Sequence, residues 1–221
     1  QKKNATDTQD IHITDKDVTA VVQQNPVLYD KTGENHYDII SAFIKSIRGS
    51  DPNAAVYYLA RMIEGGEDPS FIARRLIVAA SEDIGNANPT ALVVATACFQ
   101  AVNMVGYPEA RIVLSQCATY LATSPKSNAA YRAISNAQNL VRETGNLPVP
   151  LALRNAPTTL MQDAGYGKGY EYSHDQPGSF SPQEYLPDTI RGRTLYEPGD
   201  NAREKEIRAA LKKLWGEKYG Y

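Results

Sequence analysis

Prolines that each follow a residue suited to a turn recur along the chain at nearly constant separations. The pairs are Asp51-Pro52, Asp68-Pro69, Asn88-Pro89, Tyr107-Pro108 and Ser124-Pro125. Successive prolines are 17, 20, 19 and 17 residues apart. Proline fits the first position of an α-helix, because the N–H that it lacks has no intrahelical partner there. Asp or Asn before it can accept hydrogen bonds from the free N–H groups. This spacing predicts consecutive helices of roughly 12 to 16 residues joined by short turns.

The apolar residues between the prolines follow a helical period. Two sets obey the i, i+3, i+4, i+7 rule: Ile40, Phe43, Ile44 and Ile47, then Ala55, Tyr58, Leu59 and Met62. Residues 90–105 are apolar on nearly every side, which predicts a central, buried helix. No internal sequence similarity accompanies the spacing, so a repeat protein is not expected. The prediction is an all-α fold, an antiparallel helical array with one core over residues 31–145.

The sequence changes character near residue 145. Residues 146–221 begin with a proline-rich stretch that should run extended, and then allow one short helix ending at Gly165. Tyr170–Tyr172 and Arg193–Tyr196 alternate as short strands do and could form a β-ribbon, which would need a surface to pack on. The last helix should present an apolar stripe, formed by Ile207, Ala210, Leu211 and Leu214. This segment is expected to pack on the helical array as part of the same domain.

Residues 1–30 combine a polar start with one isolated helix. Thr14 suits the N-cap of that helix, with Asp17 three residues on. A single amphipathic helix is marginal in water, so we expect it to belong to a larger unit. The polar start lacks the apolar region of a signal peptide. No apolar run approaches 18 residues, so no membrane span is expected.

Composition and cysteine usage narrow the classes of function. The chain has 221 residues, of which 42% are hydrophobic and 22% charged, with a net charge of −2. This is ordinary globular composition with no general attraction to nucleic acid, so any basic surface must be local. Cys98 and Cys117 lie among apolar helical positions without partnering histidines. They are expected to be buried thiols in a reducing compartment.

The stretch from 73 to 89 raises the question of an acid/base or metal site. Adjacent side chains on a helix point about 100° apart, so Glu82 and Asp83 are not expected to converge. The favoured interpretation is a helix end, in which Gly85 takes the left-handed conformation, Asn86 lies in the turn and Asn88 caps the next helix. Two carboxylates in a last turn oppose the helix dipole, so a neighbouring helix should supply positive charge. The five residues are therefore predicted to form a structural network.

Other catalytic patterns are missing or incomplete. The stretch GYGKGYEY lacks the spacing of a phosphate-binding loop, so no nucleotide site is expected. His12, His36 and His174 are scattered, and His174 beside Asp175 favours a local hydrogen bond over catalysis. One alternative stays open for the basic and aromatic residues of the C-terminal segment, Arg154, Tyr166, Lys168, Tyr170 and Tyr172. They could form a surface that stacks single-stranded nucleic acid, or a loop packed on the array.

Several long stretches resemble a known family. They are residues 46–55, 73–89, 124–131, 149–161, 165–175 and 185–187, in the same order, within residues 12–215. They are similar to the C-terminal part of the RarA/MgsA family of AAA+ ATPases. These replication-associated recombination proteins are related to the Werner-helicase-interacting protein. One departure is Ser124, where the family more often has alanine.

The resemblance implies an assembly role in DNA-dependent ATP hydrolysis at replication forks, in recombination and in repair. Residues 1–30 resemble the end of the AAA+ lid. The remainder resembles the clamp-loader collar, which assembles a homotetramer. ATP and magnesium would belong to an ATPase core that this sequence lacks, so no catalysis and no cofactor are expected here. Candidate DNA contacts are Arg48, Arg74, Arg75, Lys126, Arg154 and Lys168, together with the final helix. The resemblance also implies single-stranded or fork DNA as a ligand, and single-strand-binding protein or replisome components as partners. It further implies a bacterial, cytoplasmic, nucleoid-associated location. The alternative is a nucleic-acid-binding module.

Overall fold

The computed structural model describes Thr14 and residues 34–221. The helices are α2 Glu34–Arg48, α3 Pro52–Glu64, α4 Pro69–Ala79, α5 Thr90–Val105, α6 Ala110–Thr123, α7 Ala129–Thr144, α8 Thr159–Asp163 and α9 Ala202–Tyr219. The described residues contain no strand, which confirms the all-α prediction. Within this part of the chain, no helix combines the length and apolar composition needed to cross a membrane. The predicted helix after Thr14 lies almost wholly outside the described residues.

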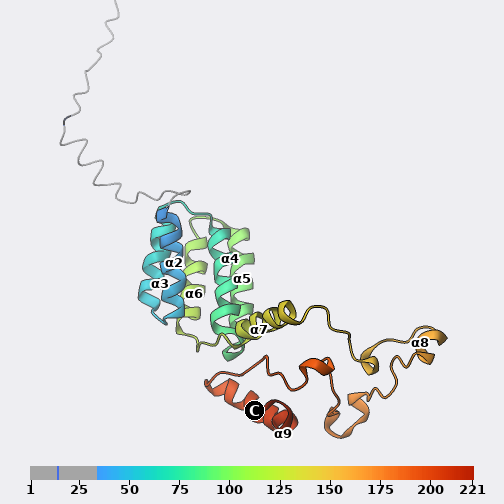
Figure 1. Cartoon of the computed structure of the whole chain (residues 1–221). Coiled ribbons are helices and arrows are strands. Elements are labelled where there is room, and N and C mark those ends of the chain that lie inside the picture. The colour runs from blue at the N-terminus through green and yellow to red at the C-terminus, as the bar shows by residue number, and fades with distance from the viewer. Residues whose placement is uncertain (1–13, 15–33) are drawn as a thin grey trace, which may run out of the picture.

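Helices α2 to α6 form a bundle, and α6 is its central helix (Figure 1). It packs against α2, α3, α4 and α5. Its inward positions alternate leucine with small side chains, and all are buried: Ala110, Leu114, Cys117, Ala118, Leu121 and Ala122. The small residues allow four neighbouring helices to approach closely around one axis. The thiols of Cys98 and Cys117 are both buried, as predicted.

The prediction that residues 90–105 form the central helix is wrong. Helix α5 lies at the side of the bundle, packed against α4 and α6 (Figure 1). Its inner positions are buried, but Val93 is 66% exposed and Met104 is 85% exposed. Apolar composition on every side indicates that a helix is fully covered, but it does not identify the surface that covers it. In the part of the chain that the structure describes, only one side of α5 is covered.

The prediction that each of these prolines begins a helix is confirmed where aspartate precedes the proline. Asp51 and Asp68 each accept two backbone N–H bonds, and Pro52 and Pro69 begin α3 and α4. The prediction fails at the other three sites, where α5, α6 and α7 begin after the proline without a side-chain cap. An aspartate before the proline offers two acceptor oxygens to the free N–H groups of the helix. Tyr107 has no side-chain acceptor in reach of those groups.

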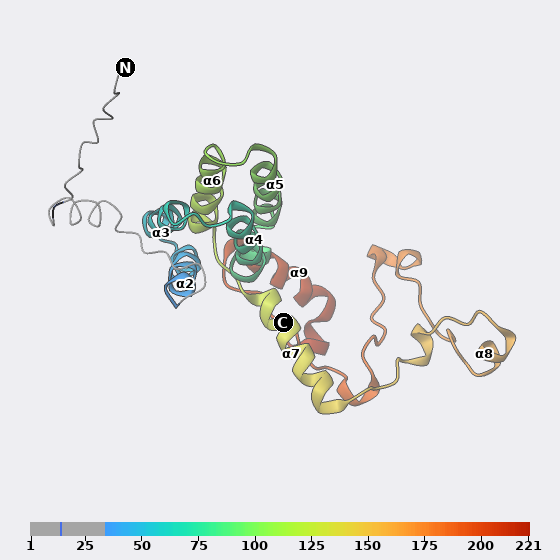
Figure 2. The same cartoon turned by 90° about the horizontal axis from the view of Figure 1, so that it is seen from above.

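Residues 145–200, which we call the arm, leave the bundle after α7 and return to α9 (Figures 1 and 2). The predicted β-ribbon is absent from the arm as described. The side chain of Gln183 donates to the carbonyl of Glu171 at 2.7 Å and accepts from its N–H at 3.2 Å. A side-chain amide thus uses the backbone groups that a pairing strand would need.

Helix α9 packs near the turn at residues 85–87, so the C-terminal helix lies against the end of the bundle. The predicted apolar stripe is only partly right, because Ala210 is exposed and Leu214 is 45% exposed. The inward side instead carries Glu204, Ile207, Leu211 and Trp215. The Trp215 ring lies 4.9 Å from Phe180, 6.1 Å from Tyr185 and 5.8 Å from Tyr219. This aromatic cluster holds residues 180–185 of the arm on α9.

Candidate functional site

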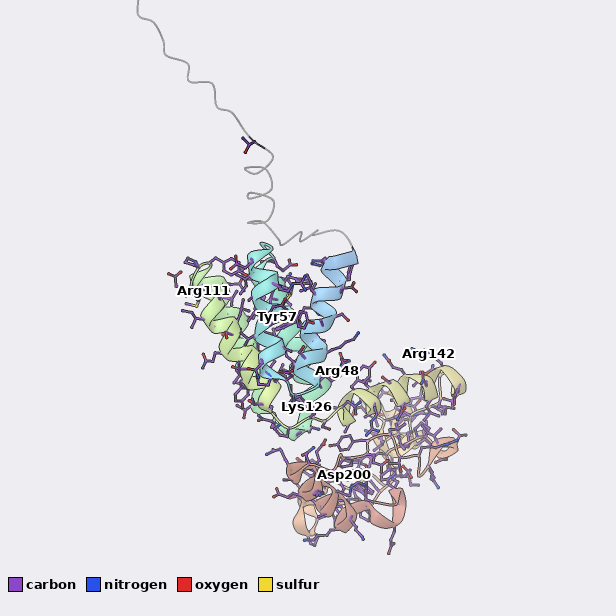
Figure 3. The ribbon with its side chains drawn as sticks, turned by 90° about the vertical axis from the view of Figure 1, so that its left-hand side faces the viewer. Arg48, Tyr57, Arg111, Lys126, Arg142 and Asp200 are labelled. Carbon is purple, nitrogen blue, oxygen red and sulfur yellow. The ribbon has the colours of Figure 1, made fainter. Side chains whose placement is uncertain are left out.

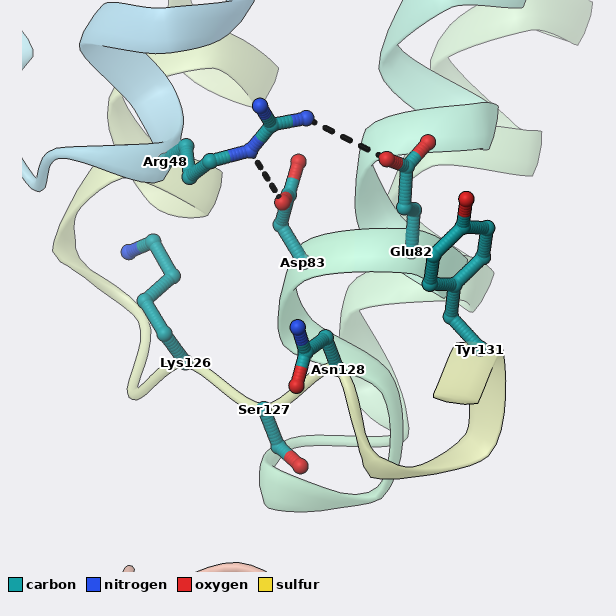
Figure 4. Close-up of a pocket in the computed structure, with 7 residues that line it drawn as sticks. All are labelled: Arg48, Glu82, Asp83, Lys126, Ser127, Asn128 and Tyr131. Atoms are coloured by element: carbon teal, nitrogen blue, oxygen red, sulfur yellow. Dashed lines mark hydrogen bonds and ion pairs between the residues drawn. The ribbon is translucent and has the colours of Figure 1, made fainter. Parts of the chain in front are cut away.

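A polar cleft of about 440 Å³ lies where the bundle meets α7 (Figure 4). It is lined by Arg48, Glu82, Asp83, Lys126, Ser127, Asn128 and Tyr131. Arg48, the last residue of α2, donates from Nη2 to Glu82 Oε1 at 3.2 Å and from Nε to Asp83 Oδ1 at 2.5 Å. The hydrogen bond to Asp83 raises the pKa of Arg48, despite partial burial of the guanidinium. Positive charge from a neighbouring helix therefore compensates the two carboxylates, as predicted.

The expectation that Glu82 and Asp83 would not converge is wrong. Both carboxylates face the guanidinium of Arg48 (Figure 4). They belong to a π-helical turn, Ala80–Ile84, which changes the angle between adjacent side chains from its α-helical value. The guanidinium also presents several donors in a planar fork, so one cation can bind two separate carboxylates.

Lys126 belongs to the structural network. Its Nζ donates to three carbonyls at the end of α6, those of Leu121 at 3.1 Å, Ala122 at 2.9 Å and Ser124 at 2.6 Å. A fourth bond of 3.0 Å reaches the Ser50 hydroxyl. Burial lowers the pKa of Lys126, while the charge of Asp83 opposes this shift. A cation at the C-terminal end of a helix satisfies free carbonyls and complements the helix dipole. This geometry favours a helix-capping role over the predicted DNA contact.

Gly85 ends the π-helical turn with φ +47° and ψ −131°, and the positive φ was predicted. A Cβ at this position would lie 3.1 Å from the carbonyl oxygen of Ser127. The same loop is fixed by a 2.8 Å bond from the Ser127 N–H to the Asp83 carbonyl. Conformation and close approach therefore both require glycine here.

Asn88 lies in the turn but does not cap α5, so that prediction is wrong. Its side-chain nitrogen donates to the Tyr120 hydroxyl at 3.0 Å and to Ser124 Oγ at 3.2 Å. The amide thus ties the turn to the C-terminal end of α6. Asn86 also lies in the turn, where it donates to the hydroxyl of Tyr196 at 3.3 Å.

The cleft does not assemble a catalytic set. Lys126 and Arg48 already donate to acceptors, and the Ser127 hydroxyl accepts from the Ala129 N–H at 3.2 Å rather than contacting the lysine. Within the described residues, no group of three or more His, Cys, Asp or Glu side chains is placed to hold a metal ion. The charge pairs join α2 to the π-helical turn, and the bond from the Ser127 N–H to the Asp83 carbonyl joins that turn to the loop before α7.

The other predicted DNA contacts are spread over separate elements. Arg74 is half-exposed and pairs with Asp68 at 3.5 Å, and Arg75 has a buried Nε without a partner in the described part of the chain. In the arm, Arg154 donates to the Val149 carbonyl at 2.7 Å and lies 5.0 Å above the Tyr166 ring. Figure 3 shows that Arg48 and Lys126 lie near the junction, whereas Arg142 lies at the far end of α7 and Arg111 at the far end of the bundle.

Exposed aromatic side chains remain in the arm. Tyr170 is 47% exposed and Tyr172 is 54% exposed, and Lys168 between Tyr166 and Tyr170 is also exposed. His174 lies 5.2 Å from the Tyr172 ring in a local turn. These residues do not form a strand, so any stacking surface would be a loop.

Two anchors of the C-terminal region were missed by the sequence reasoning. Glu204 is fully buried and accepts from the Gly199 N–H at 3.1 Å and from Asn201 Nδ2 at 2.6 Å, while its own N–H donates to Asn201. The Asn-x-x-Glu spacing is the signal for such a capping box. The second anchor joins Lys218 of α9 to Glu184 of the arm at 2.8 Å.

Comparisons with known proteins agree with the resemblance in the motifs. A family model described as MgsA AAA+ ATPase C terminal matches residues 49–215, and one described as AAA C-terminal domain matches residues 1–48. The chain is 52% identical over 189 residues to an uncharacterized protein of Thermotoga maritima, covering 86% of this chain and 31% of that protein.

Two further relatives carry names. Replication-associated recombination protein A of Coxiella burnetii is 46% identical, with 83% of this chain and 42% of that protein covered. The ATPase WRNIP1 of Dictyostelium discoideum is 44% identical, with 85% of this chain and 22% of that protein covered. The chain therefore spans less than half the length of each of these relatives.

Proposed function

The chain belongs to the MgsA family of AAA+ ATPase C-terminal domains, and from that premise we propose that it assembles a DNA-dependent ATPase into a homotetramer. The parent protein would act in replication-fork maintenance, recombination and repair, as the name replication-associated recombination protein A suggests for the relatives. Single-strand-binding protein or replisome components are proposed partners. A bacterial, cytoplasmic, nucleoid-associated location is part of the same proposal.

Exposed apolar surface on two helices supports the assembly role. Helix α7 has an apolar stripe that runs along its whole length, formed by Ala130, Ala133, Ile134, Ala137, Leu140 and Val141. Ile134 is 57% exposed and Val141 is 63% exposed, and Ala129 is the one buried residue of this 16-residue helix. An amphipathic helix of this kind is stabilised mainly by covering its apolar face. The exposed part of this stripe, with the outer side of α5, is the observation that carries the proposal, although Ala137 and Leu140 also line a pocket with apolar residues of the arm.

The domain organisation follows from this role. Residues 1–30 are proposed to belong to the AAA+ lid, and residues 31–145 to form the oligomerisation domain. Residues 146–221 would complete the same domain, because α9 and its anchors return to the turn at residues 85–87. ATP and magnesium would bind in the ATPase core of the parent protein, and this chain is proposed to have no catalytic activity and no cofactor.

Light scattering of the 221-residue chain is the direct test of assembly. We expect the mass of four chains at micromolar concentration, and a monomer would refute the proposal. A parallel titration with ATP and magnesium should show neither binding nor hydrolysis. Turnover that survives repurification and depends on Lys168 would overturn the non-catalytic role.

The second candidate is a nucleic-acid-binding module, favoured by the exposed Tyr170 and Tyr172 beside Lys168. Stacking of bases on aromatic rings next to cations is the usual mode of single-strand binding. Under the assembly proposal, by contrast, binding should be weak and salt-sensitive, because neutralising about three or four phosphates per subunit would give a log-affinity slope near −0.7 per contact against log salt. Fluorescence anisotropy with single-stranded DNA across a salt series tests this. Tight, salt-insensitive binding by a monomer would favour this candidate over assembly.

A further inference from the structure

The outer face of α5 is unusual for an exposed helix surface. None of the 16 residues of α5 is charged, whereas the solvent side of a surface helix is normally rich in charge. Helices α4 and α6 cover the inner side alone, so Leu92, Val93, Met104 and Val105 remain 43%, 66%, 85% and 50% exposed. Depletion of charge and enrichment of apolar side chains mark the core of a protein interface.

Two polar side chains on this face already have partners within the chain. The Thr96 hydroxyl donates to the Leu92 carbonyl at 2.8 Å, and Asn103 Nδ2 donates to the Phe99 carbonyl at 2.7 Å. Asn103 Oδ1 also accepts from the Ser70 hydroxyl at 2.8 Å. These two groups stay satisfied when the face is covered, whereas the exposed amide of Gln100 on the same face would need a partner in the contact.

We propose that the outer face of α5 pairs, antiparallel and about a twofold axis, with the same face of a second copy of this chain. This inference rests on the proposed assembly role and assigns one of its interfaces. The absence of cations makes the face a poor site for DNA or for an anionic lipid surface. A charge-free face requires an equally apolar partner, and the same face of another copy meets that requirement without any like-charge contact.

The arrangement of residues along α5 is compatible with self-pairing. In an antiparallel pair centred between Cys98 and Phe99, residue i lies opposite residue 197 − i. Val93 then faces Met104 of the second copy, so the two most exposed apolar side chains of α5 meet, whereas Leu92 and Val105 lie on opposite flanks of the helix. Ala97 lies near the axis, where its small side chain allows the two helices to approach closely.

The exposed apolar surface continues past the end of α5. Helix α5 alone offers a strip of roughly 24 Å by 10 Å, which is short of the ~800 Å² per partner of a stable interface. Tyr107 and Ile112, in the following turn and at the start of α6, are 39% and 60% exposed. The proposed contact would have to include such residues to approach that size. An isologous contact here and a second contact at the α7 stripe would together close a tetramer.

A charged side chain on this face provides the first test. Val93→Glu should halve the mass measured by light scattering, because it places two carboxylates in an apolar contact. Ala60→Glu, at an exposed position inside α3, is the matched control and should keep the wild-type mass. Unfolding curves would establish that both variants are folded.

Engineered cysteines provide the second test, which defines the register. Residues 93 and 104 lie about 16 Å apart along one helix, beyond the reach of a disulfide within the chain. The double variant Val93→Cys with Met104→Cys should therefore form a cross-linked dimer on mild oxidation. Each single variant should not, since equal residues of the pair are also about 16 Å apart. The wild-type chain, oxidised in the same way, shows whether the native Cys98 and Cys117 form any cross-link by themselves.

The outcomes separate this inference from the proposed function. If the wild-type chain is a monomer, both the proposed assembly role and the α5 interface are refuted. A wild-type tetramer whose mass is unchanged by Val93→Glu but reduced by Ile134→Glu would leave assembly standing and overturn the α5 interface. Cross-linking of the single Val93→Cys variant as efficient as that of the double variant would overturn the antiparallel register.

Discussion

Replacing Gly85 with alanine tests how tightly the bundle is joined to α7. The backbone at Gly85, with φ +47° and ψ −131°, lies in a region that L-residues rarely adopt. Holding alanine there costs about 1–3 kcal/mol. The new Cβ would also lie 3.1 Å from the Ser127 carbonyl oxygen, and that loop is held by its bond to Asp83. Relaxation is therefore restricted, and we expect a total loss of about 2–3 kcal/mol.

Thermal unfolding followed by circular dichroism measures this loss. For a chain of this size, 2–3 kcal/mol corresponds to a fall in Tm of roughly 4–12 °C. Gly106→Ala is the matched control, because Gly106 has φ +64° but no atom within 4 Å of the added Cβ. The difference between the two variants isolates the contact with Ser127. An unchanged Tm for Gly85→Ala would refute the account of this turn.

Three other changes probe the same region and the C-terminal anchor. Asn88→Ala should cost about 1–2 kcal/mol in denaturant unfolding, because two hydrogen bonds to α6 are lost. Arg48→Met should cost about 1–3 kcal/mol, since it leaves Asp83 buried without its cation, although the half-exposed arginine reduces the effect. Burial alone would raise the pKa of Glu184, but the bonds from Lys218 and from a backbone N–H outweigh it and lower that pKa in the folded state. This stabilisation is present above the ordinary carboxyl pKa near 4.3 and is lost as pH falls through the lowered value. Lys218→Gln should therefore weaken the loss of stability with acid in a pH series of melting curves. An equal acid dependence in wild type and variant would contradict that assignment.

Features set by a few neighbouring residues were predicted well from the sequence. The Asp-Pro starts of α3 and α4 depend on a carboxylate and the next three N–H groups, so local chemistry determines them. The positive φ at Gly85 has the same local origin. Lys126 shows a local signal that was overlooked, since a lysine just past the end of a helix can reach the last carbonyls.

Features that depend on distant segments were predicted poorly. Glu82 and Asp83 converge on Arg48 because the turn is π-helical, and the packing of α2 against that turn cannot be seen in the spacing of the two acids. Similarly, alternation at Tyr170–Tyr172 suggested a strand, but the side chain of Gln183 occupies the backbone groups of Glu171. A single side chain twelve residues away thus decides the local structure.

The misplacement of α5 has a different physical origin. Hydrophobic residues on all sides of a helix indicate that most of its surface should be covered in the functional state. They do not indicate whether the same chain or another chain covers it. Helix α6 is less apolar overall, yet it is central because Ala110, Ala118 and Ala122 let its neighbours close around it. The buried side of α5 is also small, with Ala91, Ala95 and Cys98, so small residues alone do not identify the central helix. What distinguishes α5 is an outer face without charge that carries large apolar side chains such as Met104, which is why we propose that a second chain covers it.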